Sequence, residues 1–129
     1  MTLVTDWGVY APYFSEHEFR CKYTGECKMD KEYMDTLLAV RMEYGKMMRV
    51  TSGYRSPKHP IEAAKSKPGE HSKGRCADFG VRGADAVELL RIALKHGMTR
   101  IGVQQKGSGR FLHLGMGGGH LSTPAIWSY

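Results

Sequence analysis

The stretch GEHSKGRCADF, residues 69–79, turns and then enters a predicted strand, and it carries two candidate metal ligands. His71 and Asp78 are side chains of the kind that zinc accepts. Gly74 lies between them and can adopt a positive φ, which lets the chain reverse so that both side chains face one point. On its own, the stretch is more typical of a turn leading into an ordinary strand than of a metal site.

A metal site at this point needs a third ligand, and His113 in RFLHLGM (residues 110–116) is the best candidate. It lies between apolar residues on a predicted strand, where an imidazole without a partner is costly to bury. Two imidazoles and one carboxylate leave the fourth tetrahedral position of zinc open, which is typical of catalytic rather than structural sites. A core histidine with an ordinary hydrogen-bond partner is the competing interpretation.

Two long helices are predicted on either side of this stretch. Asp30 is a good N-cap for a helix that ends near Tyr44, with Gly45 as its stop. A second helix is expected over 84–96. Its apolar residues recur at helical spacing on one face, namely Val87, Leu90, Ala93 and Leu94.

The remaining pattern predicts four strands and one short helix. Strands are expected at 47–53, 75–81, 100–105 and 110–116, the last two joined by the hairpin signal KGSG. A short helix is expected between Pro60 and Pro68. The simplest arrangement is α+β: one domain over residues 1–129, with helices packed on one side of a small, largely antiparallel sheet.

The composition limits the classes of function. The chain has 129 residues, of which 41% are hydrophobic and 25% charged, as expected for one globular domain with a real core. It has no apolar run of about 18 residues and no basic segment followed by an apolar core, so we expect neither membrane insertion nor a secretory signal. The net charge of +6 favours polyanionic surroundings. Since no basic run is interleaved with aromatic residues, we expect no nucleic-acid partner.

Three cysteines cannot all pair within one chain. Cys21 and Cys27 bracket KYTGE, a predicted turn, and either form a local disulfide, hold a metal with help from elsewhere, or remain free thiols. Cys76 lies in an apolar strand context and is interpreted as a small core residue.

Three motifs together resemble a known family. SGYRSP (52–57), HSKGRCAD (71–78) and FLHL (111–114) are similar to motifs of the zinc D-Ala-D-Ala carboxypeptidases and endopeptidases that cut peptidoglycan stem peptides. The similarity is greatest to the short, single-domain members of bacteriophages and bacteria, and it extends from about Tyr13 to Tyr129. The family pattern runs S-G-Y-R-S-P, S-x-H-x-x-G-x-A-x-D and H-x-D.

This resemblance implies a set of roles. His71, Asp78 and His113 would bind Zn²⁺, and Arg55 would hold a substrate carboxylate or carbonyl and stabilise the oxyanion formed on attack. The substrate would be a peptidoglycan stem peptide or cross-link, cut by a carboxypeptidase or an endopeptidase. We expect a monomer, encoded by a phage and made in the host cytoplasm, that acts on the cell wall or is carried in the virion.

Three positions depart from the family pattern. Gly69 replaces a serine, Cys76 replaces an alanine, and Gly115 replaces the aspartate two residues after the third ligand. Residue 115 shares the strand face of His113 at a distance of about 7 Å. A glycine there can neither orient a ligand nor accept a proton.

The residue that acts as general base is therefore not assigned by the motifs. Glu70, next to His71, is one candidate, and His59 and His120 are two others. The sequence favours a zinc metallopeptidase with an unassigned base. The alternative is a non-catalytic descendant of the family that contains zinc and binds peptidoglycan.

Overall fold

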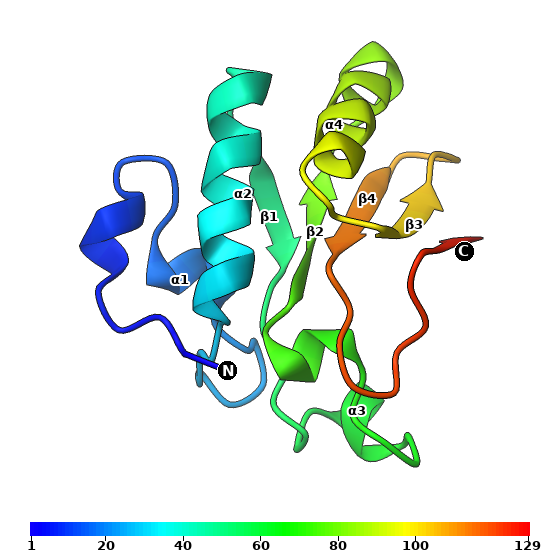
Figure 1. Ribbon diagram of the computed structural model, residues 1–129. Coiled ribbons are helices and arrows are strands. Elements are labelled where there is room, and N and C mark those ends of the chain that lie inside the picture. Colours follow the sequence, from blue (N-terminus) through cyan, green and yellow to red (C-terminus); the bar gives the residue numbers. More distant parts are fainter.

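Five strands form one sheet in the order β1-β2-β4-β3-β5 in the computed structural model, which describes residues 1–129 (Figure 1). Neighbouring strands are antiparallel except β3 and β5, which are parallel. The strands are β1 (Arg49–Ser52), β2 (Cys76–Gly80), β3 (Arg100–Gln104), β4 (Phe111–Gly115) and β5 (Ala125–Ser128). The four predicted strands are present. β5 was not predicted, and it adds an edge strand from the C-terminal AIWSY.

The register of the central strands fixes which residues share a face. Asp78 of β2 pairs with His113 of β4, and His113 pairs with Gly102 of β3. Because side chains alternate along a strand, Cys76 and Gly115 lie on the same face as this row. The opposite face carries the apolar residues of the same strands.

Four α-helices and two 3-10 turns complete the fold. They are η1 (Trp7–Tyr10), α1 (Glu16–Phe19), α2 (Lys31–Tyr44), α3 (Pro60–Ala63), η2 (Glu70–Lys73) and α4 (Gly83–Lys95). The two long helices lie side by side over the apolar face of the sheet (Figure 1). This single α+β domain, with its mostly antiparallel sheet, confirms the fold class expected from the sequence.

The ends of α2 follow from local sequence chemistry. The Asp30 side chain accepts a hydrogen bond from the backbone N–H of Tyr33, 3.2 Å away. Such an N-cap satisfies one of the orphan donors of the first turn. At the other end the helix stops at Gly45, as predicted, and this glycine is left-handed.

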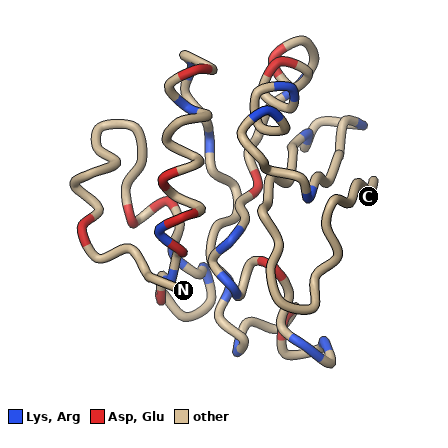
Figure 2. Tube along the Cα trace, viewed as in Figure 1, with Lys and Arg blue, Asp and Glu red and all other residues tan.

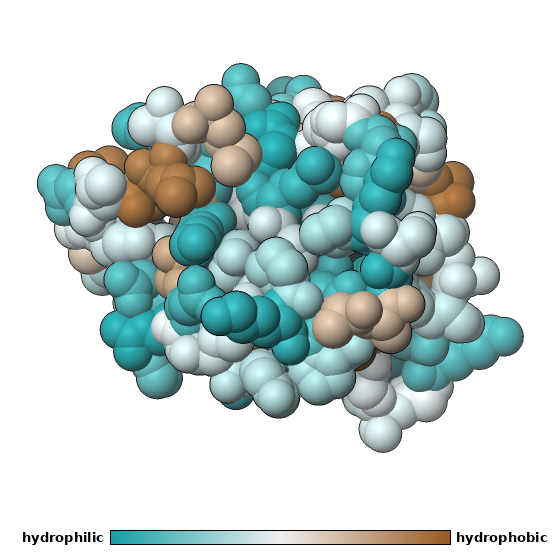
Figure 3. All heavy atoms as spheres, turned by 90° about the horizontal axis from the view of Figure 1, so that it is seen from below, coloured by the Kyte–Doolittle hydropathy of each residue, from teal (hydrophilic) through white to brown (hydrophobic).

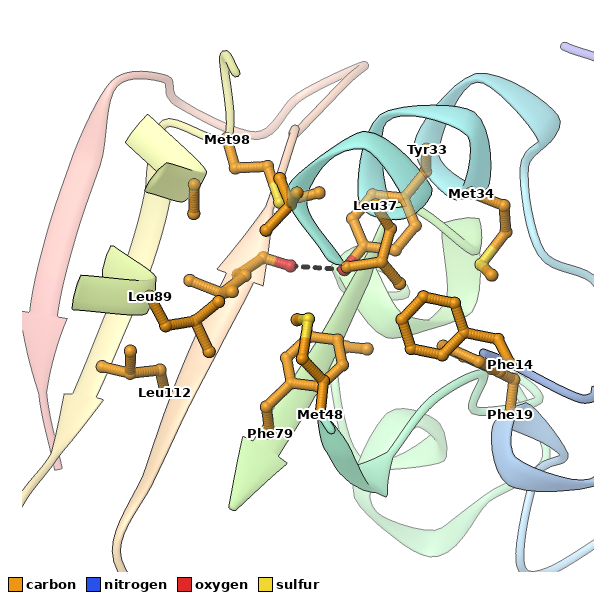
Figure 4. Close-up of a cluster of buried hydrophobic side chains, with 14 of the residues drawn as sticks. Phe14, Phe19, Tyr33, Met34, Leu37, Met48, Phe79, Leu89, Met98 and Leu112 are labelled. Carbon is orange, nitrogen blue, oxygen red and sulfur yellow. Dashed lines mark hydrogen bonds between the residues drawn. The ribbon is translucent and has the colours of Figure 1, made fainter. Parts of the chain in front are cut away.

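The core lies between the two long helices and the sheet (Figure 4). From α2, Tyr33 and Leu37 reach the strands, and the Tyr33 hydroxyl donates to the carbonyl oxygen of Leu114 at 2.8 Å. Phe79 of β2 lies toward them, and Leu112 of β4 lies beside Leu89 of α4 (Figure 4). All of these side chains are almost fully buried.

The buried face of α4 differs from the expected one. Val87 is 70% exposed and Leu94 is 47% exposed, whereas Leu89 and Ile92 are each 1% exposed. The helix carries apolar residues on two adjacent faces, and its packing on β4 and α2 selects the one that contains Leu89. Of the expected face, Ala93 is buried and Leu90 packs against the core, so the prediction was wrong only for Val87 and Leu94.

The surface is mixed in charge and mostly hydrophilic. Basic and acidic residues alternate along the helices and loops (Figure 2), and hydrophobic residues form only separate patches on the face viewed from below (Figure 3). No helix has the length and apolar content needed to cross a membrane. All three cysteines are free thiols, so Cys21 and Cys27 form no disulfide.

Candidate metal centre

His71 enters the centre from η2, a single turn that ends at Gly74. Gly74 has a φ of 66°, and a Cβ there would overlap the carbonyl oxygen of Lys28, so only glycine fits. This confirms the predicted reversal. The His71 Nδ1 lies 2.7 Å from the carbonyl oxygen of Gly53, which can only accept, so Nδ1 carries the proton. The lone pair of Nε2 is therefore left for a metal.

Asp78 and His113 face each other across β2 and β4. The Asp78 Oδ1 lies 3.0 Å from the His113 Nδ1, and its Oδ2 lies 3.6 Å from the His71 Nε2. The two imidazole rings stand 5.1 Å apart at an interplanar angle of 75°. The structure thus brings together the three side chains that the sequence selected.

Their spacing and chemistry suit a zinc ion. In a tetrahedral site with bonds of about 2.1 Å, neighbouring ligand atoms lie about 3.4 Å apart. The Asp78 oxygens are 3.0 and 3.6 Å from the two imidazole nitrogens, close to that edge length. Two nitrogens and one carboxylate are a donor set that zinc commonly takes. The residues therefore fit the metal.

The electrostatics of the centre favour a cation between its carboxylates. Burial raises the pKa of Asp78, but the hydrogen bond from the His113 Nδ1 outweighs it and holds the pKa well below its usual range. Burial lowers the pKa of His113, but hydrogen bonds to Asp78 and Glu70 raise it above its ordinary value. In the metal-free protein the two carboxylates thus favour the protonated form of His113 between them.

Glu70, the residue before His71, reaches the other side of the His113 ring. Its Oε1 lies 2.6 Å from the His113 Nε2 and accepts from the Arg100 Nε at 3.1 Å. Its Oε2 accepts from the backbone N–H of Gly117 at 2.7 Å. Burial raises the pKa of the Glu70 carboxyl, but these three donors together lower it below its ordinary value. Glu70 is therefore an ionised, fully engaged carboxylate.

A cavity of about 310 Å³ opens onto this centre. His71, His113 and Glu70 line it together with three cationic side chains, Arg55, Lys65 and Arg100. The Arg55 Nη2 lies 4.0 Å from the Asp78 Oδ2, and its Nη1 lies 3.5 Å from the Glu62 Oε2. Arg55 thus stands beside the centre, with 21% of its side chain exposed.

Two aromatic residues of the cavity were not identified from the sequence. Trp127 lies 5.0 Å from the His113 ring and beneath the Arg100 guanidinium, also at 5.0 Å, and Tyr129 lines the same cavity. Trp127 belongs to β5, which pairs with β3, and Tyr129 directly follows that strand. The alternation of aromatic residues in AIWSY is the signal that predicts one shared strand face.

The other two base candidates lie outside the cavity lining. The His59 Nδ1 accepts from the backbone N–H of Ile61 at 3.1 Å and so caps α3. His120 is exposed in a turn closed by the bridge between Gly118 and Leu121. Neither residue is among those that line the cavity. Of the three candidates, only Glu70 contacts the centre.

Cys76 is buried, as expected, but it faces the centre rather than the apolar core. Its Sγ and one nitrogen from each of His71 and His113 lie within 4.8 Å of one another. Burial raises the pKa of this thiol well above its ordinary value, so it is protonated in the metal-free protein. The interpretation of Cys76 as a packing residue alone therefore needs correction, since a thiol at this distance is a potential metal ligand.

Comparison with known proteins agrees with this geometry. A search of curated proteins gives no significant match. A family model described as Peptidase M15 matches residues 12–115, a range that contains Arg55, Glu70, His71, Asp78 and His113. The match covers most of the chain, and the donor set at the centre suits the zinc on which that family depends. The chain therefore belongs to the peptidase M15 family of metallopeptidases.

Proposed function

We propose that the protein is a zinc-dependent peptidase that hydrolyses amide bonds in peptidoglycan stem peptides or their cross-links, as a phage cell-wall lytic enzyme. The observation that carries this proposal is the convergence of His71, Asp78 and His113 beside a cavity lined by three cations. The net charge of +6 also favours contact with an anionic wall.

Different residues would serve different roles in amide hydrolysis. Zinc held by His71, Asp78 and His113 would supply the Lewis acidity that polarises the scissile carbonyl and activates water. The Gly53 carbonyl fixes the tautomer of His71, so that its Nε2 is the nitrogen presented to the metal. Arg55, whose Nη2 lies 4.0 Å from the Asp78 Oδ2, would bind the carbonyl oxygen as negative charge develops on it.

The cavity suits a peptide that bears a free carboxylate. In its lining, Arg55 and Lys65 both contact the Glu62 carboxylate, and Arg100 stacks on Trp127. A guanidinium binds a carboxylate through two parallel hydrogen bonds, which fixes the orientation of the substrate as well as its position. The aromatic rings would pack against the aliphatic part of the peptide.

A direct test uses purified peptidoglycan and the zinc-loaded protein. Release of D-alanine identifies a carboxypeptidase, and new amino groups without D-alanine identify an endopeptidase. The His71→Ala variant serves as the control and is expected to release neither. Full activity of that variant, or no product from the wild type on several wall types, would contradict the proposal.

A second candidate function rests on Cys76. If its sulfur joins His71, Asp78 and His113, four protein ligands close the coordination sphere, which is typical of structural zinc. The protein would then bind peptidoglycan without cutting it. X-ray absorption of the zinc-loaded protein separates the two functions, because a sulfur neighbour at about 2.3 Å is expected only for the closed site.

A further inference from the structure

The space beside the strand residue Gly115 is filled by a side chain from another part of the chain. Gly115 follows His113 by two positions and shares its face of β4. A Cβ built on Gly115 would overlap the carboxylate carbon and both oxygens of Glu70. The backbone at Gly115 does not have the positive φ that excludes other residues. Glycine is needed there because of the space Glu70 occupies.

The Glu70 carboxylate is held from three directions in that space. It contacts the His113 ring at 2.6 Å, the Gly117 N–H at 2.7 Å and the Arg100 Nε at 3.1 Å. Arg100 is itself fixed by the carbonyl oxygen of Ser122 at 2.5 Å and by Trp127. With 3% of its side chain exposed, Glu70 has little freedom to leave.

This contact decides which nitrogen of His113 faces the ligand set. The Glu70 oxygens already accept from the Arg100 Nε and the Gly117 N–H, which can only donate, so the carboxylate faces the His113 ring as an acceptor and the Nε2 beside it carries a proton. The Nδ1, which lies 3.0 Å from Asp78, is then the nitrogen that gives up its proton to bind a metal. Metal-bound histidines commonly donate their other N–H to a carboxylate in this way, which orients the ring and increases its basicity.

We propose that Glu70 is the positioning carboxylate of His113, delivered from η2 into the space that Gly115 leaves open on β4. This inference rests on the proposed zinc site. Positions 70 and 115 are alternative sources of one carboxylate, because a side chain at position 115 would have to displace the Glu70 carboxylate. Gly115 then marks a relocation of the carboxylate rather than its loss.

The relocation is tested by moving the carboxylate back to the strand. The experiment measures the zinc affinity of the metal-free full chain by competition with a chromophoric chelator. Glu70→Ala is expected to weaken zinc binding by about 10- to 100-fold, as for other partners of metal-bound histidines. Gly115→Asp alone forces two carboxylates into one space and is expected to weaken zinc binding and to lower the melting temperature.

The double variant Glu70→Ala/Gly115→Asp is expected to bind zinc within about threefold of the wild type. Glu70→Gln keeps the shape of the side chain and can accept from Nε2–H without a charge, so an intermediate affinity is expected. Glu43→Ala, which changes an exposed glutamate of α2, is the matched control and should bind zinc like the wild type. Circular dichroism of each metal-free variant shows whether it is folded.

A spectroscopic signature separates positioning from a merely structural role. In zinc-loaded wild type, long-range ¹H–¹⁵N spectra should show His113 protonated at Nε2, and Glu70→Gln should broaden or shift that signal while the fold persists. Equal zinc affinity in wild type and Glu70→Ala, or a folded double variant no better than Glu70→Ala, would overturn the inference alone. Failure of the wild type to bind zinc would overturn the proposed function and this inference with it.

Discussion

The two faces of strands β2 and β4 are both buried, but they are held together by different physics. On one face, Ala77, Phe79, Leu112 and Leu114 are at most 1% exposed and pack beneath α2 and α4. On the other face, Asp78 and His113 are 7% and 3% exposed and are held by opposite charges and hydrogen bonds. The first face needs only shape and apolar area, whereas the second needs each polar partner in its place.

The largest effect is expected from a substitution on the polar face, at Asp78. Asp78→Asn removes the charge that approaches both imidazoles, so we expect zinc affinity to fall by about a thousandfold or more. The rise in melting temperature that zinc produces in the wild type should disappear. A chelator-competition titration measures both the wild type and the variant. Unchanged zinc affinity would show that Asp78 is not a ligand.

The next largest effect is expected on the apolar face, at Phe79, which follows Asp78 in β2. Phe79→Ala opens a cavity under α2 and should lower the free energy of unfolding by about 3–5 kcal/mol. Urea denaturation of the metal-free protein measures this loss. Zinc should still stabilise this variant, although its metal-free form is less stable than the metal-free wild type. Loss of zinc binding in a folded Phe79→Ala variant would mean that the two faces are not separable.

Arg55 provides a third test, because it adjoins the polar face without being a proposed ligand. Arg55→Ala should lower kcat/KM on peptidoglycan peptides by about 100-fold, since one oxyanion partner is lost. Zinc affinity should remain near that of the wild type. Arg55→Lys retains the charge but not the two-pronged geometry, so only partial activity is expected. If Arg55→Ala loses zinc rather than activity, the residue supports the ligands instead of the substrate.

The pH dependence of stability separates the two faces without mutation. Asp78 and Glu70 have lowered pKa values in the folded protein, so their stabilisation is present above their unfolded pKa of about 4 and is lost as pH falls. His113 has a raised pKa, so its stabilisation is present below about pH 6.5 and is lost as pH rises through its folded value. The metal-free protein should therefore be most stable between about pH 4.5 and 6.5.

Bound zinc replaces the proton on His113, so the decline on the alkaline side should vanish in the zinc-loaded protein. Melting temperatures between pH 3 and pH 9, with chelator and with zinc, measure both curves. His113→Gln without metal should also lack the alkaline decline. A decline of equal size in that variant would assign the effect to other groups.

The sequence predicts the ligand set more completely than the residues that support it. Local chemistry made His71, Asp78 and His113 candidates, and the resemblance of the three motifs to the family selected them as the ligand set. Glu70 adjoins His71 in sequence, but its contact with His113 and Gly117 depends on how η2 approaches β4. Trp127 reaches the site only because β5 pairs in parallel with β3, a long-range choice that no local pattern encodes.

Helix α4 shows the same limit on the apolar face. Its sequence has apolar residues on two adjacent faces, one with Leu89 and Ile92 and one with Val87 and Leu94. Periodicity identifies a helix in either case, but it cannot select the face that meets the sheet. The selection comes from the contacts of α4 with α2 and β4.

The smallest expected effect tests that selection directly. Val87→Ala removes atoms that are mostly in contact with water, so the free energy of unfolding should change by less than about 0.5 kcal/mol. Leu89→Ala, two positions away on the buried face, should cost about 2–5 kcal/mol. Urea denaturation of the two variants under one set of conditions gives the comparison. Neither variant should alter zinc affinity, because α4 packs on the apolar side of the sheet. Equal losses of unfolding free energy in the two variants would mean that both faces of α4 are covered in solution.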